Sequence, residues 1–581
     1  MFSNAVLAGA LGVAYLVVVF FQLNPAVPLY PMNLLPLLVT LALFYGVHLT
    51  VLFYGVIVFR QIVGYEEFSP AWLSLRLLSW FFAAVATGAA ALVWTNLGLY
   101  AQMLPLETAR RMAAGGAVIT GAAFVFLFVA VVRYSFGRRR GRVGSSILAL
   151  TAVASLVLPL LARGPGESPT LASRPLDLDL GLAPPAAGPR VVMILLDGGS
   201  LDFISNAALE GKLPNFGKVL DAGAAMHLAT LRPTQPDPVW TTVATGKLPW
   251  KTGVRSAGLY RVPAASDSFE MLPDHCFAQG LVHFGLFRTA SHSSSSWRVR
   301  PLWRILATAG MSSGIVNWPL THPAQPVRGY VVSPLFYRPG DPSLEPDDPA
   351  SIYPLEDLPL ARSAGERLKR PAAAEEPALA AVRSEAAGLG GGPPHLIDRM
   401  HEEVSQALQA RARPRLSAVR YTQLDEAGHR FLRFAMPGEF GDVSAEERRR
   451  FGALLETAYA RVDAIVGRAL TSLEPDDLLL IVSGFGMEPL GIAKRTLDRA
   501  LGGEDLSGSH EDAPDGFVLA WGRSVQPGRK QRASVYDVTP TILYFLGMPV
   551  ARDMDGYART DIFRRDFTAA RPLAVIPTFE Q

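Results

Sequence analysis

Five apolar stretches in the first 163 residues constrain this chain more than any other feature. They lie at about residues 5–22, 32–59, 77–98, 113–132 and 145–162. Each approaches or exceeds the roughly 20 residues that a helix needs to cross ~30 Å of hydrocarbon. Because a helix satisfies its own backbone hydrogen bonds in lipid, we expect an α-helical membrane domain of five spans over residues 1–163. The first stretch is not typical of a signal peptide, since no Lys or Arg precedes it and further spans follow.

Arginines in the loops predict the orientation of these spans. Residues 1–163 hold ten Arg, no Lys and three acidic residues, and five of the Arg lie between Arg133 and Arg142. Assigning the second and fourth loops to the cytoplasm places seven of the loop Arg inside and two outside, as the positive-inside rule requires. We therefore expect a cytoplasmic N-terminus and an extracytoplasmic location for residues 164–581. The Ala-, Arg- and Pro-rich composition favours a bacterial inner membrane, with these residues in the periplasm.

The remainder of the chain has a different character. Residues 1–163 carry a net charge of +7 and the whole chain +3, so residues 164–581 carry −4. A mildly acidic domain lacks the net positive charge that is typical of nucleic-acid-binding domains. The only cysteine is Cys276, so an intrachain disulfide is excluded. Residues 164–189 are rich in Pro, Gly, Ala and Ser, which predicts a linker. A globular domain is expected over 190–565, followed by a tail over 566–581.

Short apolar runs within the globular domain predict an α/β fold. Residues 190–197 and 478–483 are almost continuously apolar, residues 417–425 form a similar but more polar run, and longer amphipathic stretches separate them. Such runs are typical of central strands in a mostly parallel sheet that helices cover on both faces. In such folds, polar residues at the carboxyl ends of the strands lie at the edge where ligands bind.

Candidate metal ligands follow these runs. Asp197 ends the first run, and Asp425 and His429 follow the second at a spacing of four residues, which places both on one face of a helix. His510 lies in a loop before another apolar run at 517–521. Two histidines and one carboxylate are suitable ligands for zinc. Lys247, after Thr245 and Gly246, is a candidate phosphate contact or a surface lysine.

Several motifs resemble the alkaline phosphatase superfamily in its type I phosphodiesterase/nucleotide pyrophosphatase branch. They occur in the family's order at residues 194–198, 238–246, 424–429, 482–487, 508–510, 537–547 and 554–556. The resemblance implies an alkaline-phosphatase-like fold and a site with two metal ions and a Ser or Thr nucleophile. It assigns one ion to Asp425, His429 and His510, and the other to Asp197 and an Asp-His pair. The arrangement of five membrane spans followed by such a domain also resembles the topology of lipoteichoic acid synthases and phosphoethanolamine transferases.

The second metal site departs from the family pattern. The positions of its Asp-His pair hold Gly484 and Phe485, and the nucleophile position holds Pro236. None of these side chains can ligate metal or attack phosphorus. A shifted loop leaves Thr234 or Asp237 as alternative nucleophiles. Asp197 is then either a remaining metal ligand or a cap of the following helix. Three losses fall on one ion and its nucleophile, whereas all three ligands of the other ion are present.

We therefore expect a catalytically degenerate, membrane-anchored binding or scaffold protein of the cell envelope. It would hold one zinc or manganese ion or none, and would contact membrane lipid and either a protein partner or further copies of itself. The alternative is an active metal-dependent phosphodiesterase or phosphotransferase that acts on lipid headgroups or envelope phosphodiesters with one-metal chemistry. A transporter is disfavoured, because the spans contain few ionisable residues.

Overall fold

The computed structural model describes the chain apart from residues 1, 25–26, 28–30, 65–74, 132–139, 165–187, 264, 266–267, 273–279, 338–347, 370–393, 442, 493, 497–505, 511 and 581. The predicted linker lies almost entirely in one of these gaps. The chain forms two compact units. The first comprises Met1–Leu171 and Arg255–His292, and the second comprises Ala172–Val254 and Ser293–Gln581. Each unit is described separately below.

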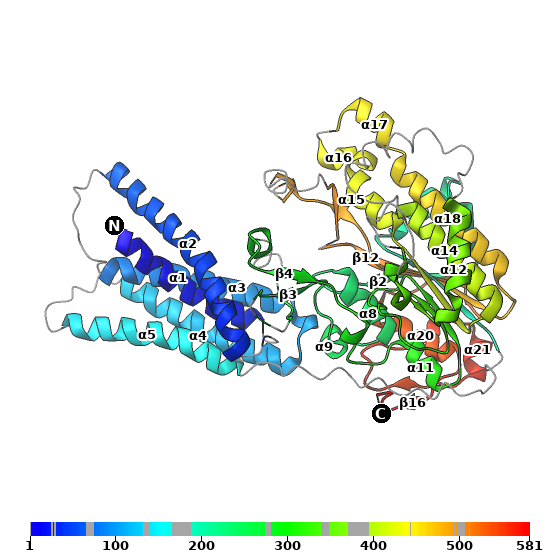
Figure 1. The fold of residues 1–581 in the computed structure, drawn as a ribbon, viewed down its shortest axis with the longest axis horizontal. Coiled ribbons are helices and arrows are strands. Elements are labelled where there is room, and N and C mark those ends of the chain that lie inside the picture. The colour runs from blue at the N-terminus through cyan, green and yellow to red at the C-terminus, as the bar shows by residue number, and fades with distance from the viewer. Residues whose placement is uncertain are drawn as a thin grey trace. The chain divides into compact units, whose positions relative to one another are not determined.

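The first unit contains five long helices, drawn in blue and cyan in Figure 1. These are α1 (Phe2–Leu23), α2 (Pro31–Gly64), α3 (Leu75–Leu99), α4 (Leu106–Val131) and α5 (Arg140–Arg163). All five are long and apolar enough to cross a membrane, with candidate spans at Ala5–Leu23, Leu34–Val63, Ser79–Leu99, Leu106–Val131 and Ser145–Arg163. A short hairpin of β3 (Leu259–Arg261) and β4 (Arg288–Ala290) belongs to the same unit.

Buried hydrogen bonds hold the chain together where α1 and α5 end. The guanidinium of Arg163 donates to the carbonyl oxygens of Phe21 at 2.7 Å and Asn24 at 2.9 Å, and also to that of Val27. Arg163 and Asn24 are both buried. Because these carbonyls lie beyond the helical hydrogen-bonding pattern, the arginine supplies the partners that a buried helix end requires.

The second unit is built on one mixed, mostly parallel sheet, which confirms the predicted fold class. Among the described residues it has ten strands in the order β13-β2-β12-β9-β1-β8-β5-β6-β7, with β14 beside β2. The strands are β1 (Val191–Leu196), β2 (Ala224–Ala229), β5 (Ser313–Val316), β6 (Gly329–Val332), β7 (Ile352–Tyr353), β8 (Leu416–Tyr421), β9 (Leu478–Phe485), β12 (Asp515–Trp521), β13 (Gly528–Arg529) and β14 (Ala533–Ser534). The central strand β1 is parallel to both neighbours, β8 and β9.

Helices cover both faces of this sheet (Figure 1). Ile194, Leu196 and Ile481 pack in one core with helices α6, α7, α12, α14, α15 and α18. The bounds are α6 (Leu201–Leu209), α7 (Pro214–Ala222), α12 (Leu358–Lys369), α14 (Pro394–Ala412), α15 (Gln423–Ala435) and α18 (Leu454–Ser472). The opposite face meets α8 (Pro236–Thr245), α11 (Leu302–Thr308) and α20 (Val538–Phe545). Burial on both faces explains why the sequence of β1 is continuously apolar.

Local signals set the helix ends near the centre of the sheet. Ser200 is the N-cap of α6, where its side chain accepts from the backbone N–H of Phe203. The alternative in which Asp197 caps this helix is therefore wrong. Helix α8 begins with Pro236, whose missing N–H costs nothing in the first turn. It ends at Gly246 in the left-handed conformation.

The end of the chain packs on the same unit. Helix α21 (Arg565–Ala570) is followed by β16 (Val575–Ile576), which pairs with β15 (Val550–Ala551). Lys247, which the sequence suggested as a surface lysine or a phosphate contact, has a side chain only 3% exposed. Its Nζ contacts Asp553 Oδ2 at 2.7 Å and Glu580 Oε1 at 2.8 Å. Lys247 therefore attaches the C-terminal segment to the domain.

Candidate functional site

The candidate site lies where three neighbouring strands end. Leu196, the last residue of β1, is opposite Tyr421 of β8 and Ser483 of β9. Asp197 follows β1 directly, α15 begins just after β8, and β9 continues to Phe485. Since parallel strands end at the same edge, this topology brings together residues that are up to 288 positions apart in sequence.

Helix α15 is held in place by a buried carboxylate that the sequence analysis missed. Asp398 on α14 accepts hydrogen bonds from the backbone N–H groups of Thr422 and Gln423, at 3.0 to 3.1 Å. A carboxylate at a helix N-terminus accepts hydrogen bonds from backbone N–H groups that have no partner within the helix, and its negative charge interacts favourably with the helix dipole. Burial nevertheless dominates and raises the pKa of Asp398 to about 7. This contact orients the helix that carries Asp425 and His429.

Asp425, His429 and His510 come together as the sequence predicted. One ligand atom from each lies within 4.8 Å of the others, and all three residues are partly exposed. Asp425 and His429 are one turn apart on α15, with 3.5 Å between Oδ2 and Nε2. The Nδ1 of His429 is 2.8 Å from the carbonyl oxygen of Gly508, which can only accept a hydrogen bond. This contact selects the tautomer whose Nε2 lone pair faces Asp425, as ligating histidines require.

The surroundings of Asp425 favour a bound cation. Its Oδ1 is buried and has no hydrogen-bond partner among the described residues. Burial first, and then the charge of Asp197, raise the pKa of Asp425 to about 6. A buried carboxylate oxygen without a partner is costly unless a proton or a metal satisfies it. The three residues therefore fit a metal ion, with the two histidines and one carboxylate typical of zinc sites.

Asp197 is already paired with a cation from the protein itself. Nε of Arg420 donates to Asp197 Oδ2 at 2.9 Å, and Nη2 donates to the same oxygen. The other oxygen, Oδ1, accepts from Nε1 of Trp240 at 2.7 Å. The Asp197 side chain is only 2% exposed and that of Arg420 is 14% exposed. Both oxygens that a second metal ion would need are thus engaged by protein donors.

Arg420 is the second functional residue that the sequence analysis missed. It is the second-last residue of β8, and its neighbours Val419 and Tyr421 belong to the core on the opposite face. Burial opposes its charge, but the carboxylates of Asp197, Asp237 and Asp425 together keep its pKa above the usual value. A signal was present, because a charged residue within an otherwise apolar central strand requires a buried partner of opposite charge.

Gly484 and Phe485, the two positions that depart from the expected Asp-His pair, are closely packed. A Cβ on Gly484 would lie 2.5 Å from Cγ1 of Val239 on α8, so the helix occupies the space of any side chain there. Phe485 is fully buried, and its ring centroid lies 5.0 Å from that of His510 and 6.4 Å from that of Trp240. The phenyl ring therefore occupies the space between the surviving histidine and the tryptophan that binds Asp197.

The candidate nucleophiles lie at the start of α8. Pro236 is its first residue and has no reactive group. The Thr234 side chain is buried, and its hydroxyl donates to the carbonyl oxygen of Leu231 at 2.8 Å. Asp237, in the first turn of α8, is close enough to Arg420 to raise the pKa of its guanidinium. The residues present thus fit the first metal ion and do not fit the second.

We expect the substitution Arg420→Ala to destabilise the protein strongly. It would leave the Asp197 carboxylate buried beside no cation, which typically costs about 3–5 kcal/mol. Chemical denaturation of the purified full-length protein measures this loss. Arg523→Ala is the matched control, because Arg523 forms an exposed 3.8 Å pair with Asp476. The double variant Asp197→Asn with Arg420→Gln should recover part of the loss. Equal stability of Arg420→Ala and the control would contradict the role of this pair.

We also expect Gly484→Ala to destabilise the protein by about 1–3 kcal/mol, because the added methyl group overlaps Val239. Adding Val239→Ala should make the double variant more stable than the sum of the two single changes predicts, in a double-mutant cycle. Gly438→Ala is the control, since a Cβ there meets no atom within 4 Å. An unaffected Gly484→Ala protein would show that the position has room for a metal-ligating side chain.

This chain is similar to one known protein family and to several solved structures. A model of the family "Type I phosphodiesterase / nucleotide pyrophosphatase" matches residues 191–538, or 348 of the 581 residues. Similar solved structures include murine ectonucleotide pyrophosphatase/phosphodiesterase 5, with 13% identity, a TM-score of 0.38, and coverage of 65% of this chain and 100% of that one. A mutant of alkaline phosphatase PafA has 11% identity and a TM-score of 0.41, with coverage of 65% and 100%. No curated protein sequence matches.

The matched region contains the central strands, the covering helices other than α20, and the candidate site. It spans more than half of the chain. The chain therefore belongs to the type I phosphodiesterase/nucleotide pyrophosphatase family.

Proposed function

We propose that this protein is a catalytically degenerate member of the family, which binds or scaffolds other components of a cell envelope. The ion pair between Arg420 and Asp197 carries this proposal. It engages the carboxylate that a second metal ion would require, and Trp240 engages its remaining oxygen. Gly484 and Phe485 supply no replacement ligand, and Pro236 supplies no nucleophile.

The expected effect of these residues on the reaction rate supports the same proposal. Two-metal phosphoryl transfer uses one ion beside the attacking oxygen and the other beside the leaving oxygen. Loss of a nucleophile alone typically lowers rates by orders of magnitude. Here Pro236 stands at the nucleophile position, and Gly484 and Phe485 stand where the resemblance implies the Asp-His pair, so this proposal disfavours ordinary two-metal hydrolysis.

The remaining triad supports a single bound ion, zinc or manganese, at Asp425, His429 and His510. Such an ion would join α15 to the segment around His510, which otherwise meet through β11 (Gly508–Ser509) and the Gly508 carbonyl. In this proposal the ion has a structural role, because it would link two separate segments and so stabilise the fold.

The five apolar helices support a membrane anchor, with the N-terminus in the cytoplasm and residues 164–581 outside. The excess of arginine in the second and fourth loops supports this orientation. In a bacterium these residues would lie in the periplasm, held at the inner membrane. Membrane lipid is then one partner, and an envelope protein or a second copy of the chain is the other.

The second candidate function is a one-metal phosphodiesterase or phosphotransferase that acts on lipid headgroups or envelope phosphodiesters. The intact triad favours it, because a single bound metal lowers the pKa of a coordinated water. In that case Arg420 would contribute positive charge beside the metal, from a side chain that remains 14% exposed.

Metal content tests the triad. We expect the purified full-length protein to contain about one zinc or manganese ion per chain, because three protein ligands with correct chemistry hold zinc tightly. His429→Ala should lose most of this metal, measured by atomic emission after gel filtration. His283→Ala is the control, since that exposed histidine lies outside the triad. Equal metal content in both variants would contradict a bound ion at Asp425, His429 and His510.

Hydrolysis distinguishes the two candidate functions. We expect no turnover of bis-p-nitrophenyl phosphate above the buffer rate, with added zinc or manganese, because Pro236, Gly484 and Phe485 supply neither the usual nucleophile nor the ligands of a second ion. Metal-dependent turnover that His429→Ala abolishes would overturn the degenerate reading and support the one-metal enzyme. Turnover that survives His429→Ala would indicate a contaminating hydrolase, which a repeated purification of both variants would remove.

A further inference from the structure

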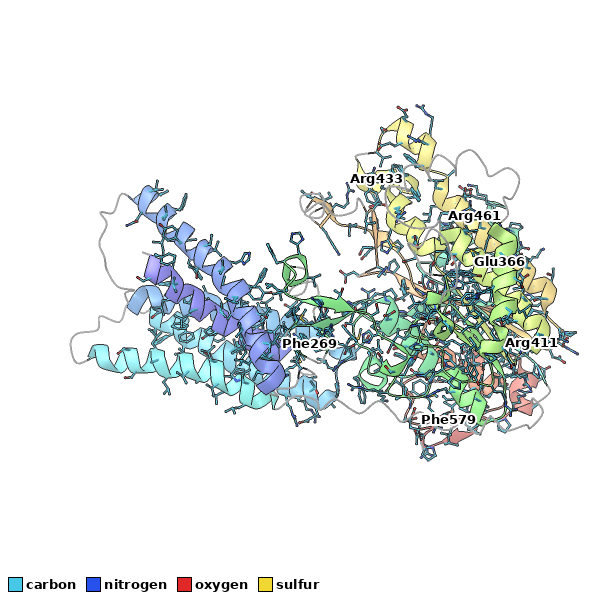
Figure 2. All side chains as sticks on the ribbon, in the orientation of Figure 1. Phe269, Glu366, Arg411, Arg433, Arg461 and Phe579 are labelled. Atoms are coloured by element: carbon cyan, nitrogen blue, oxygen red, sulfur yellow. The ribbon has the colours of Figure 1, made fainter. Side chains whose placement is uncertain are left out.

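Residues 255–292 leave the second unit and join the five helices. Val254 and Ser293, which flank them, belong to the second unit, whereas Arg255–His292 pack within the first. The segment has its own buried anchor, because Arg255 Nε donates to Glu270 Oε2 at 2.9 Å and both side chains are nearly inaccessible. Its aromatic core includes Phe269, labelled in Figure 2, whose ring lies 5.8 Å from that of Phe287.

Two separate contacts attach this segment to the helices. The backbone N–H of Leu272 donates to Asn24 Oδ1, just beyond α1, at 2.5 Å. Further along, a Cβ on Gly280 would lie 2.9 Å from Cζ of Phe44 on α2, so a side chain at this position would have to displace the Phe44 ring. The ring of Phe284 then lies 5.6 Å from that of Phe44 and 5.9 Å from that of His48.

The position of Phe44 along α2 sets the depth of the second contact. The candidate span Leu34–Val63 has 30 residues. At about 1.5 Å per residue it is ~45 Å long, roughly 15 Å more than the hydrocarbon of a bilayer. Phe44 lies ten residues, or about 15 Å, inside the end nearest Asn24. Whether the excess length projects on that side or is taken up by tilt, Phe44 lies within the adjacent half of the bilayer.

The surface at this contact is apolar and uncovered by described residues. Phe284 is 61% exposed, and Leu43 and Val47 beside Phe44 are 61% and 60% exposed. His48 donates or accepts within its own helix, because its Nδ1 lies 2.6 Å from the carbonyl oxygen of Phe44. The exposed faces of α2 and of Phe284 thus form one apolar surface, which lipid chains would cover if α2 spans a membrane.

We propose that residues 280–287 insert into the extracytoplasmic leaflet beside α2, with Phe284 in contact with lipid acyl chains. This inference rests on the proposed membrane anchorage. The sequence of this stretch, Gly-Leu-Val-His-Phe-Gly-Leu-Phe, is apolar apart from one histidine. At eight residues it is far too short to span a bilayer and escapes any search for spans. The chain would therefore return to the membrane about 117 residues after its last span.

Acyl-chain quenching in nanodiscs tests the proposal on the full-length protein. The native cysteine is first removed by Cys276→Ser, and single cysteines then carry a fluorescent label. Phe284→Cys is the test position. Phe124→Cys on α4, 68% exposed, reports on lipid, and Leu209→Cys on α6, 88% exposed, reports on water. His283→Cys replaces Phe284→Cys if that variant fails to fold.

We expect lipids that carry a spin label on the acyl chain to quench Phe284 about as strongly as Phe124. Quenching at Leu209 should be at least about twofold weaker, because it lies outside the hydrocarbon. Aqueous iodide should show the reverse order.

Each other outcome overturns the proposal. Lipid quenching at Phe124 but not at Phe284, with iodide access at Phe284, would place the segment in water and leave the membrane anchorage intact. Protection of Phe284 from both quenchers would show that protein, such as a second copy of the chain, covers it. Absence of lipid quenching at Phe124 would refute the anchorage itself, and the insertion with it.

Discussion

The buried pair between Arg420 and Asp197 is the contact on which the candidate site depends. A buried carboxylate is costly unless a cation or hydrogen-bond donors compensate its charge. In the family pattern that cation is a metal ion, and here it is a guanidinium from the adjacent strand. Because Arg420 and Asp197 come from neighbouring parallel strands, the pair forms together with the sheet. The charge of Asp197 is therefore balanced by the guanidinium of Arg420.

Apolar packing surrounds the end of β9 next to this pair. Phe485 is fully buried, and Val239 lies so close to Gly484 that any side chain there would clash. Packing of this kind stabilises the domain through buried surface, whereas an open metal site exposes polar groups to water. The retained triad lies on the other side, on α15, whose N-terminus Asp398 holds independently.

The helical unit shows a similar dependence on contacts between distant segments. Arg163 and Asn24 bind the chain where α1 and α5 end, and Leu272 from a much later segment joins them. Burial of these polar groups is tolerable because each has a partner. The same segment places the ring of Phe284 against Phe44 of α2. Residues 255–292, which the sequence analysis included in the globular domain, therefore belong to the helical unit.

Periodicity and motif spacing in the sequence by themselves determined the five apolar helices, the central strands and the i, i+4 pair of Asp425 and His429. These features depend on residues that are close in the chain, and burial on both faces leaves a plain apolar pattern. Only the tertiary structure decided that Arg420 pairs with Asp197, that Asp398 caps α15, and that residues 255–292 join the helices. Each of these contacts joins segments that are far apart in the sequence. Which segments become neighbours depends on the order of the strands in the sheet, so no local sequence pattern could identify the residue on the other side of the contact.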